Sequence, residues 1–88
     1  MFVVWDEPKR RSNLRDHGLD FADARDRFVW ETAEITPSSP GRRGERRFKA
    51  VGFLDGEMVT LVFAPLGSEA VAFISLRKAS NKERRAHD

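Results

Sequence analysis

The chain has 88 residues, of which 40% are hydrophobic and 34% are charged. A chain of this length hides about two thirds of its surface on folding, which suits one small domain spanning residues 1–88. The absence of cysteine excludes disulfide bonds and thiolate metal sites, and two histidines cannot form a structural zinc site by themselves. No apolar run reaches the roughly 18 residues of a membrane span, and residues 1–6 contain no basic leader. We therefore expect a cytoplasmic protein without a metal or cofactor.

Positive charge is concentrated in one stretch of the sequence. The formal net charge is only +2, and acidic and basic residues balance within residues 1–30. Within residues 42–49, however, five basic side chains accompany a single carboxylate, that of Glu45. Four of the five are arginines, which bind phosphate through paired hydrogen bonds. Such a cluster favours binding of a large anion such as nucleic acid, and the alternative is an ordinary solvated surface.

The first third of the chain predicts a strand followed by two helices. Residues 2–5 are apolar and β-forming, and Asp6 can cap a helix that ends near His17, before Gly18. A second helix begins after Asp20, which is also a good capping residue. Apolar residues recur on one face of this second helix and indicate a buried stripe: Phe21, Ala24 and Phe28.

The middle of the chain predicts a β-hairpin. Residues 46–54 and 57–64 flank Asp55-Gly56, a pair typical of two-residue type I′ turns because both residues take positive φ. The register that follows places Phe48 opposite Phe63 on an apolar face. Polar and basic side chains fall on the other, mixed face: Arg47, Lys49 and Thr60.

Further segments lie on both sides of the hairpin. Residues 31–35 predict a strand, and residues 36–44, which are rich in proline, serine and glycine, predict a mobile loop. After the hairpin, residues 70–77 predict another strand. Regular alternation in that strand places Phe73 and Arg77 on the same face.

The end of the chain predicts a short charged helix. Ser80 followed by Glu83 is a capping box, and the helix should end near His87. The predicted order is β-α-α-β-β-β-α, with three or four antiparallel strands after the second helix. This order indicates an α+β fold in which helices pack against a small antiparallel sheet.

The chain contains the side chains that RNA cleavage requires. The 2′-hydroxyl of RNA is an internal nucleophile, so a protein need only remove its proton, protonate the leaving 5′-oxygen and neutralise the charge that develops on phosphorus. Lys9, Asn13 and His17 are spaced by four residues and share one stripe of the first helix. His17 can act as base or acid near neutral pH, or can simply stabilise the end of its helix.

The candidate site residues are drawn from this helix stripe, the basic cluster and the end of the last strand. For Arg47 and Lys49 the alternative role is an ion pair with Glu45 or Glu57. The candidate catalytic residues are His17, Lys9, Arg47 and Arg77. The candidate RNA-binding residues are Arg43, Arg46, Lys49, Lys78 and Asn13.

Three motifs extend over nearly the whole chain: Trp5-Asp6-Glu7-x-Lys9-x-x-x-Asn13-x-x-x-His17-Gly18, Glu45-x-Arg47-Phe48 and Ile74-Ser75-x-Arg77-x-Ala79-x-x-x-Glu83-Arg84. Together they resemble the BrnT family of type II toxins, which are small ribonucleases with a RelE-like fold. The resemblance implies a metal-independent endoribonuclease that attacks RNA through its 2′-hydroxyl and arrests growth. It also implies RNA, free or bound to the ribosome, as substrate, and a BrnA-type ribbon-helix-helix antitoxin as partner. A toxin-antitoxin complex of this type would bind operator DNA.

One position supports a different interpretation. Many members of the family have an arginine where this chain has Ala72, just before the Ile-Ser motif. Loss of one contact that stabilises a transition state lowers the rate by about 10²- to 10³-fold. The alternative is therefore a non-catalytic module with a degenerate active site, which binds RNA, the ribosome or the antitoxin.

Overall fold

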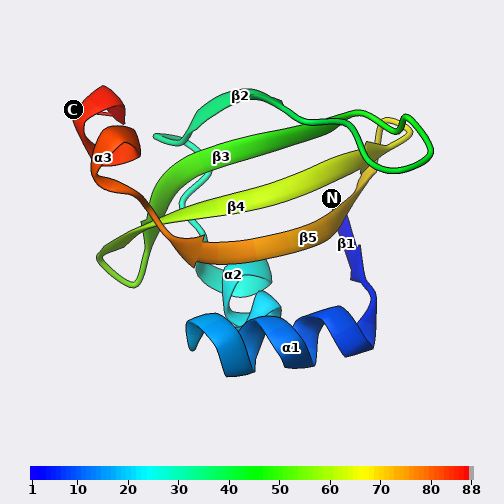
Figure 1. The fold of residues 1–88 in the computed structure, drawn as a ribbon, viewed down its shortest axis with the longest axis horizontal. Helices are drawn as coiled ribbons and strands as arrows, with labels where there is room; N and C mark the ends of the chain where they lie inside the picture. Colours follow the sequence, from blue (N-terminus) through cyan, green and yellow to red (C-terminus); the bar gives the residue numbers. More distant parts are fainter. Residues whose placement is uncertain (88) are drawn as a thin grey trace.

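The protein has an α+β fold, seen in a computed structural model that describes residues 1–87. Four strands follow the second helix, one more than the shortest predicted order, and the last element is a helix as predicted (Figure 1). The elements in chain order are β1 (Phe2–Trp5), α1 (Glu7–His17), α2 (Phe21–Arg27), β2 (Glu34–Ser38), β3 (Arg47–Leu54), β4 (Glu57–Leu66), β5 (Ala70–Lys78) and α3 (Asn81–His87).

The five strands form one sheet in the order β1-β5-β4-β3-β2. Strands β2 to β5 are antiparallel to their neighbours, whereas β1 runs parallel to β5, with Val3 beside Val71. The sheet is therefore mixed, which corrects the prediction of a purely antiparallel sheet. Because β1 pairs with β5, it covers an edge of β5 that would otherwise be exposed.

The capping residues of the first two helices act as their sequence predicts. The Asp6 carboxylate accepts a hydrogen bond from the Lys9 amide at 3.3 Å at the start of α1. Gly18 ends this helix with a φ of 70°, which glycine adopts without steric cost. Asp20 caps α2 by accepting a hydrogen bond from the Ala22 amide at 3.0 Å.

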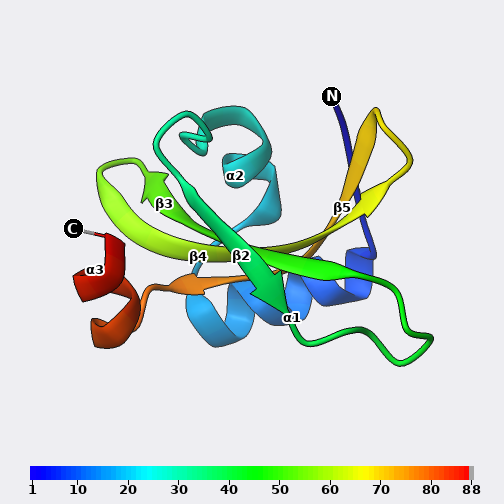
Figure 2. The ribbon, with the colours of Figure 1, turned by 90° about the horizontal axis from the view of Figure 1, so that it is seen from above.

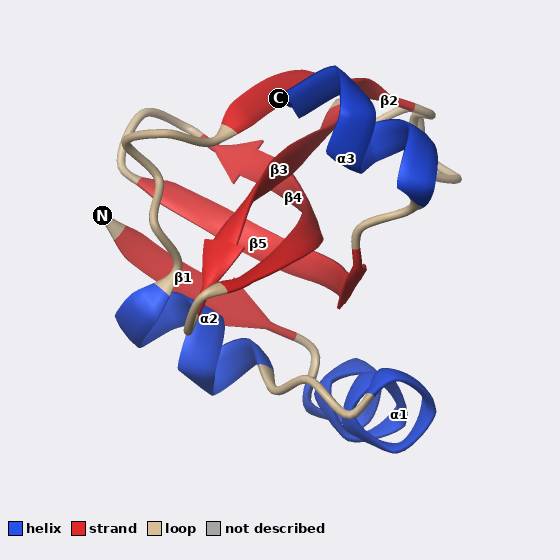
Figure 3. Ribbon diagram, turned by 90° about the vertical axis from the view of Figure 1, so that its left-hand side faces the viewer, coloured by secondary structure: helices blue, strands red, loops and turns tan. Residues whose placement is uncertain are grey.

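Helices α1 and α2 cover one face of the sheet, and the core lies between them and the strands (Figure 1). The Phe21 ring packs edge-to-face against Trp5 and against Phe73, with 6.1 Å between ring centroids in both pairs. On the other face, α3 covers only one end of the sheet, so most of that face is open (Figures 1 and 3). The largest fully buried side chains are Phe21, Phe73, Leu61, Leu76, Val59 and Thr60.

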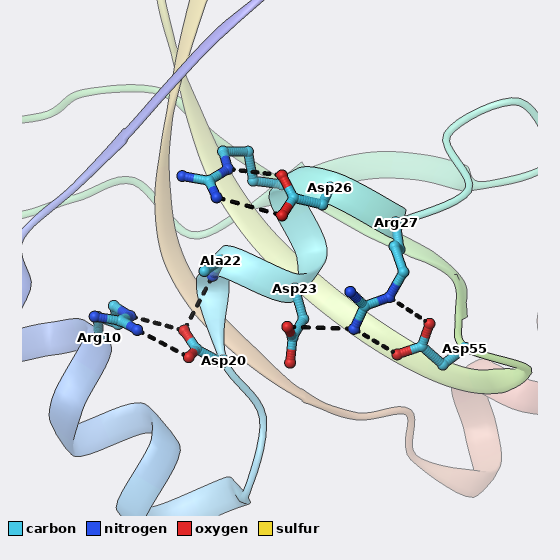
Figure 4. A network of polar contacts seen from close by, with 8 residues as sticks. Arg10, Asp20, Ala22, Asp23, Asp26, Arg27 and Asp55 are labelled. Carbon is cyan, nitrogen blue, oxygen red and sulfur yellow. Dashed lines mark hydrogen bonds and ion pairs between the residues drawn. The ribbon is translucent and has the colours of Figure 1, made fainter.

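Two paired ion contacts tie α2 to its neighbours (Figure 4). The Arg10 guanidinium of α1 donates to both carboxylate oxygens of Asp20, at 2.7 and 3.0 Å, and this hydrogen bonding lowers the pKa of Asp20. Arg27 binds Asp55 of the hairpin turn in the same way, at 2.7 and 3.0 Å. The positive charges of these two arginines are thus offset within the fold.

The hairpin of β3 and β4 confirms the predicted turn and register. Asp55 and Gly56 have φ values of 52° and 81°, as a type I′ turn requires. Phe48 lies opposite Phe63 on the core side. Successive side chains of a strand alternate between faces, so Lys49 belongs to the open face.

Strand β2 begins three residues later than predicted and includes part of the segment predicted to be a loop. It spans Glu34–Ser38 instead of residues 31–35, and it contains Pro37. Proline is tolerated here because β2 is an edge strand, in which the N–H groups that face outward have no partner strand.

Strand β5 departs from regular alternation. Its register against β4 shifts next to the Phe63–Phe73 pair, and Ile74 is the extra residue of a β-bulge. The prediction that Phe73 and Arg77 share a face is therefore wrong. Phe73 lies in the core, whereas Arg77 pairs with Thr60 and belongs to the open face.

Within residues 1–87, none of the helices is both long and apolar enough to cross a membrane.

Candidate active site

The turn that leads into β3 is organised by the side chain of Glu45. Its carboxylate accepts hydrogen bonds from the Arg43 amide and from the Arg47 guanidinium, both at 3.1 Å. The Gly41 amide donates to the Glu45 carbonyl at 3.0 Å, and the carboxylate occupies the position that a Cβ at residue 41 would take. The segment predicted as a mobile loop, residues 36–44, is thus the end of β2 followed by a turn built around a carboxylate.

A hollow of about 480 Å³ lies beside this turn. Four basic side chains and one carboxylate line it. Within residues 1–87, the ion pairs include none that engages Lys9, Arg42 or Arg43. The Nε of Arg47 is buried and has no hydrogen-bond partner among the residues that the structure describes. The hollow therefore has excess positive charge and a donor that a bound anion could satisfy. Its lining residues are Lys9, Arg42, Arg43, Glu45 and Arg47.

A second polar cluster lies on the open face of the sheet, where α3 packs (Figures 2 and 3), and its Lys49 is two residues along β3 from Arg47 of the hollow. Its centre is the Glu83 carboxylate of α3, whose side chain is only 9% exposed. Glu83 and Ser80 also form the predicted capping box, with backbone-to-side-chain distances of 2.8 and 3.2 Å. The groups that donate to the carboxylate, at 2.8–3.1 Å, are Arg77 twice, Lys49, Thr60 and the Ser80 amide.

The electrostatics of the second cluster indicate an anchoring role. The hydrogen bonds, those from Arg77 above all, hold the pKa of Glu83 far below its ordinary value of 4.5. Because five donors already occupy its two oxygens and its side chain is only 9% exposed, this carboxylate is not accessible to a proton of a substrate. Glu83 therefore fixes α3 to the sheet and offsets part of the charge of Lys49 and Arg77.

The four predicted catalytic residues do not gather in one place. Lys9 and Arg47 line the same hollow, as the prediction requires. Arg77 is bound to Glu83 on the open face, below α3. His17 is exposed at the C-terminal end of α1, about 12 Å along the helix axis from Lys9. Helix α1 lies on the face of the sheet opposite α3 (Figure 1). Of the four predicted residues, the structure brings only Lys9 and Arg47 together in one hollow.

Asn13 has a structural role. It is 7% exposed, and its side-chain Nδ2 donates to the carbonyl of Leu76 at 2.8 Å and to that of Leu19 at 3.0 Å. Its Oδ1 accepts a hydrogen bond from the Leu76 amide at 3.0 Å. The side chain thus joins α1 to β5, and this geometry gives no support to the prediction that Asn13 contacts RNA.

The remaining predicted RNA-binding residues lie at different places. Arg43 lines the hollow, and Lys49 belongs to the Glu83 cluster. The Arg46 guanidinium lies over the Phe48 ring, 5.3 Å from its centroid. Lys78 is 65% exposed and lies 3.8 Å from a carboxylate oxygen of Glu57.

Two residues of the hollow were absent from the predicted site, Arg42 and Glu45. The signal for Glu45 was present in the sequence, since it is the only carboxylate within the basic cluster. Its pKa is lowered by hydrogen bonds from its own amide and from the Arg43 amide and by the charge of Arg47. Glu45 is thus an ionised proton acceptor beside an arginine.

Among residues 1–87, no group of three or more His, Asp or Glu side chains is arranged to hold a metal ion.

Comparisons with known proteins identify similar sequences and structures. A family model described as "Ribonuclease toxin, BrnT, of type II toxin-antitoxin system" matches residues 5–83. The 1.1 Å crystal structure of the Brucella abortus ribonuclease toxin BrnT is similar, with 37% sequence identity and a TM-score of 0.73. The match covers 92% of this chain and 99% of that one. No match was found among curated proteins.

Proposed function

Because the chain belongs to the BrnT family of ribonuclease toxins of type II toxin-antitoxin systems, we propose that it cleaves RNA at the hollow beside the Glu45 turn, without a metal ion. Membership makes the protein a ribonuclease toxin with RNA as substrate and a cognate antitoxin as partner. The proposal concerns where the chemistry occurs and which side chains perform it.

One observation carries this proposal. The Glu45 carboxylate and the Arg47 guanidinium, 3.1 Å apart, line a hollow whose other side chains are basic. A proton acceptor and a phosphate-binding group are thereby held side by side. Cleavage through the 2′-hydroxyl needs only these groups and a proton donor, so no metal-bound nucleophile has to be supplied.

The proposed reaction is an internal transfer at phosphorus. Glu45 takes the proton of the 2′-hydroxyl while the 2′-oxygen forms a bond to phosphorus. Arg47 donates hydrogen bonds to the phosphoryl oxygens, including one from its unpartnered Nε, and offsets their growing negative charge. Lys9 gives a proton to the 5′-oxygen as the bond from phosphorus to that oxygen breaks. The products are a 2′,3′-cyclic phosphate and a 5′-hydroxyl end.

The environment of Glu45 suits this role over a wide pH range. Its lowered pKa keeps the carboxylate ionised at neutral pH, so it is ready to accept a proton. On the acid side, activity should decrease only when the pH falls below about 4.5, the ordinary value for glutamate, because protonation then removes the base.

Substitution of Arg47 tests the proposal. Purified protein is incubated with RNA in EDTA, and Arg47→Ala should lower the cleavage rate by about 10²- to 10³-fold. Arg15→Ala is the matched control, because Arg15 is exposed on α1 and its ion pair within the described part of the chain is with its neighbour Asp16. His17→Ala should leave the rate unchanged. Equal rates for Arg47→Ala and wild type would place the chemistry elsewhere.

The same assay separates cleavage from binding alone. If the wild-type protein shifts RNA in a gel with a steep salt dependence but leaves it intact, the chain is a non-catalytic binding module of the kind that Ala72 suggests. Intact RNA with no shift would remove both interpretations of the hollow.

We further propose that the cognate antitoxin is a BrnA-type ribbon-helix-helix protein. The support is the family membership, since type II toxins are neutralised by a protein partner. Expression of the chain alone should arrest growth, and co-expression with the product of the adjacent reading frame should restore it. Failure of that product to co-purify with the chain would contradict the proposal.

A further inference from the structure

A second cavity, of about 280 Å³, lies between α3 and the open face of strands β2 and β3. It is close to the lower size limit of small-molecule sites in proteins, about 300 Å³, so it suits a group of the size of a nucleobase. Glu34, Thr36, Lys49 and Val51 line it from the sheet. The residues that line it from the C-terminal segment are Ser80, Lys82, Glu83 and Ala86.

The cavity lies next to the proposed cleavage site along β3. Arg47 and Lys49 are two residues apart on the same face of that strand, which separates their backbones by roughly 7 Å. Neighbouring phosphates of single-stranded RNA have a comparable separation. An RNA chain whose scissile phosphate binds Arg47 therefore brings its adjacent nucleotide to Lys49 and to the cavity behind it.

The cavity combines hydrogen-bond acceptors, hydrogen-bond donors and apolar surface. Within residues 1–87, Glu34 and Lys82 take part in no ion pair or side-chain hydrogen bond, although both line the cavity. Glu34 offers two acceptor oxygens, and Lys82 offers donors. Val51 and Ala86 add apolar surface against which the flat face of a base can pack.

This pattern matches one base. Guanine presents two adjacent donors, N1–H and N2–H, beside the acceptor O6, so a carboxylate and an ammonium group can bind its edge together. Adenine, cytosine and uracil lack two adjacent donors on that edge. Proteins read unpaired RNA bases through such edges. We propose that this cavity is a guanine-binding subsite, in which Glu34 accepts from N1–H and N2–H and Lys82 donates to O6, and that it directs cleavage next to guanine. This inference rests on the proposed function.

The test combines cleavage mapping with nucleotide binding. The ends produced from an RNA pool of random sequence are sequenced for wild type, Glu34→Gln and the control Glu31→Gln, which removes the same charge at an exposed position three residues away. Wild type and the control should favour cuts next to guanine. Glu34→Gln should reduce that preference by about tenfold or more, since a bidentate contact to a base supplies discrimination of this order. Retention of the full preference in Glu34→Gln would overturn the inference.

Titration with nucleoside monophosphates separates the inference from the proposed function. The 3′- and 5′-monophosphates of guanosine, adenosine, cytidine and uridine are titrated into each variant and followed by NMR. Guanosine monophosphate should bind wild type most tightly and lose that advantage in Glu34→Gln. If wild type binds all four nucleosides equally, the subsite does not exist, even if RNA is cleaved at Arg47. If RNA is not cleaved, the titration still decides whether the cavity selects guanine.

Discussion

Glu83→Gln should destabilise the protein more than any other single removal of an exposed or half-buried charge. The carboxylate accepts five hydrogen bonds, and Gln replaces one of its oxygens by an NH₂ group that faces other donors. Hydrogen bonds to charged groups contribute about 1.5–3 kcal/mol each. Water can replace part of this, because the side chains of Lys49 and Arg77 are each 35% exposed. We expect a loss of about 2–3 kcal/mol, which lowers the Tm of a domain of this size by about 10–20 °C.

The effect should depend on pH in one direction. The pKa of Glu83 is lower in the folded protein than in the unfolded chain, so its contribution is complete above about pH 4.5 and is lost progressively as the pH falls below that value towards the lower pKa of the folded state. Thermal unfolding of wild type, Glu83→Gln and the exposed control Glu31→Gln is followed by circular dichroism at pH 7 and pH 3. The difference between wild type and Glu83→Gln should be large at pH 7 and smaller at pH 3. A difference below about 0.5 kcal/mol at pH 7, or one equal at both pH values, would refute the anchoring role.

Three further substitutions test other parts of the account. Asn13→Ala leaves the amide and carbonyl of Leu76 without their buried partner, so denaturant unfolding should show a loss of about 2–4 kcal/mol, and a loss near zero would contradict the structural role. Gly56→Ala forces a side chain into a φ of 81° and should cost about 1–2 kcal/mol by the same measurement, whereas an unchanged midpoint would argue against the type I′ turn. Gly41→Ala places a Cβ where the Glu45 carboxylate lies, so RNA cleavage should decrease while the Tm stays close to that of wild type; full activity would show that the carboxylate position does not matter.

Local signals predicted most of the elements of the fold. Helix caps and tight turns depend on contacts between residues that are only a few positions apart, so they can be predicted from the sequence. The examples here are the caps at Asp6 and Asp20, the Asp55-Gly56 turn and the Ser80–Glu83 capping box. The parallel pairing of β1 with β5 and the bulge at Ile74 depend on segments that are far apart in the chain. Alternation within β5 alone could not reveal them.

For the candidate site too, residues that are neighbours in the sequence could be predicted, whereas contacts between distant segments could not. The basic cluster and Glu45 are neighbours in the sequence, and this local pattern predicted the region in which the structure has the basic hollow. The position of His17 was predicted from the helix stripe that it shares with Lys9 and Asn13. Because Asn13 is buried against β5, the middle of that stripe faces the sheet, and its two ends are separated by the length of the helix. Only Lys9, at the start of α1, therefore reaches the hollow with Arg47.

The most direct test of the central claim uses an RNA oligonucleotide that carries a single 2′-deoxy residue at its strongest cleavage position. The ends of the products formed in EDTA are identified by mass spectrometry. If Glu45 and Arg47 promote attack by the 2′-hydroxyl, cleavage stops at the deoxy position, and every other cut ends in a 2′,3′-cyclic phosphate. Cleavage at the deoxy position, or products that end in a 5′-phosphate, would contradict the account.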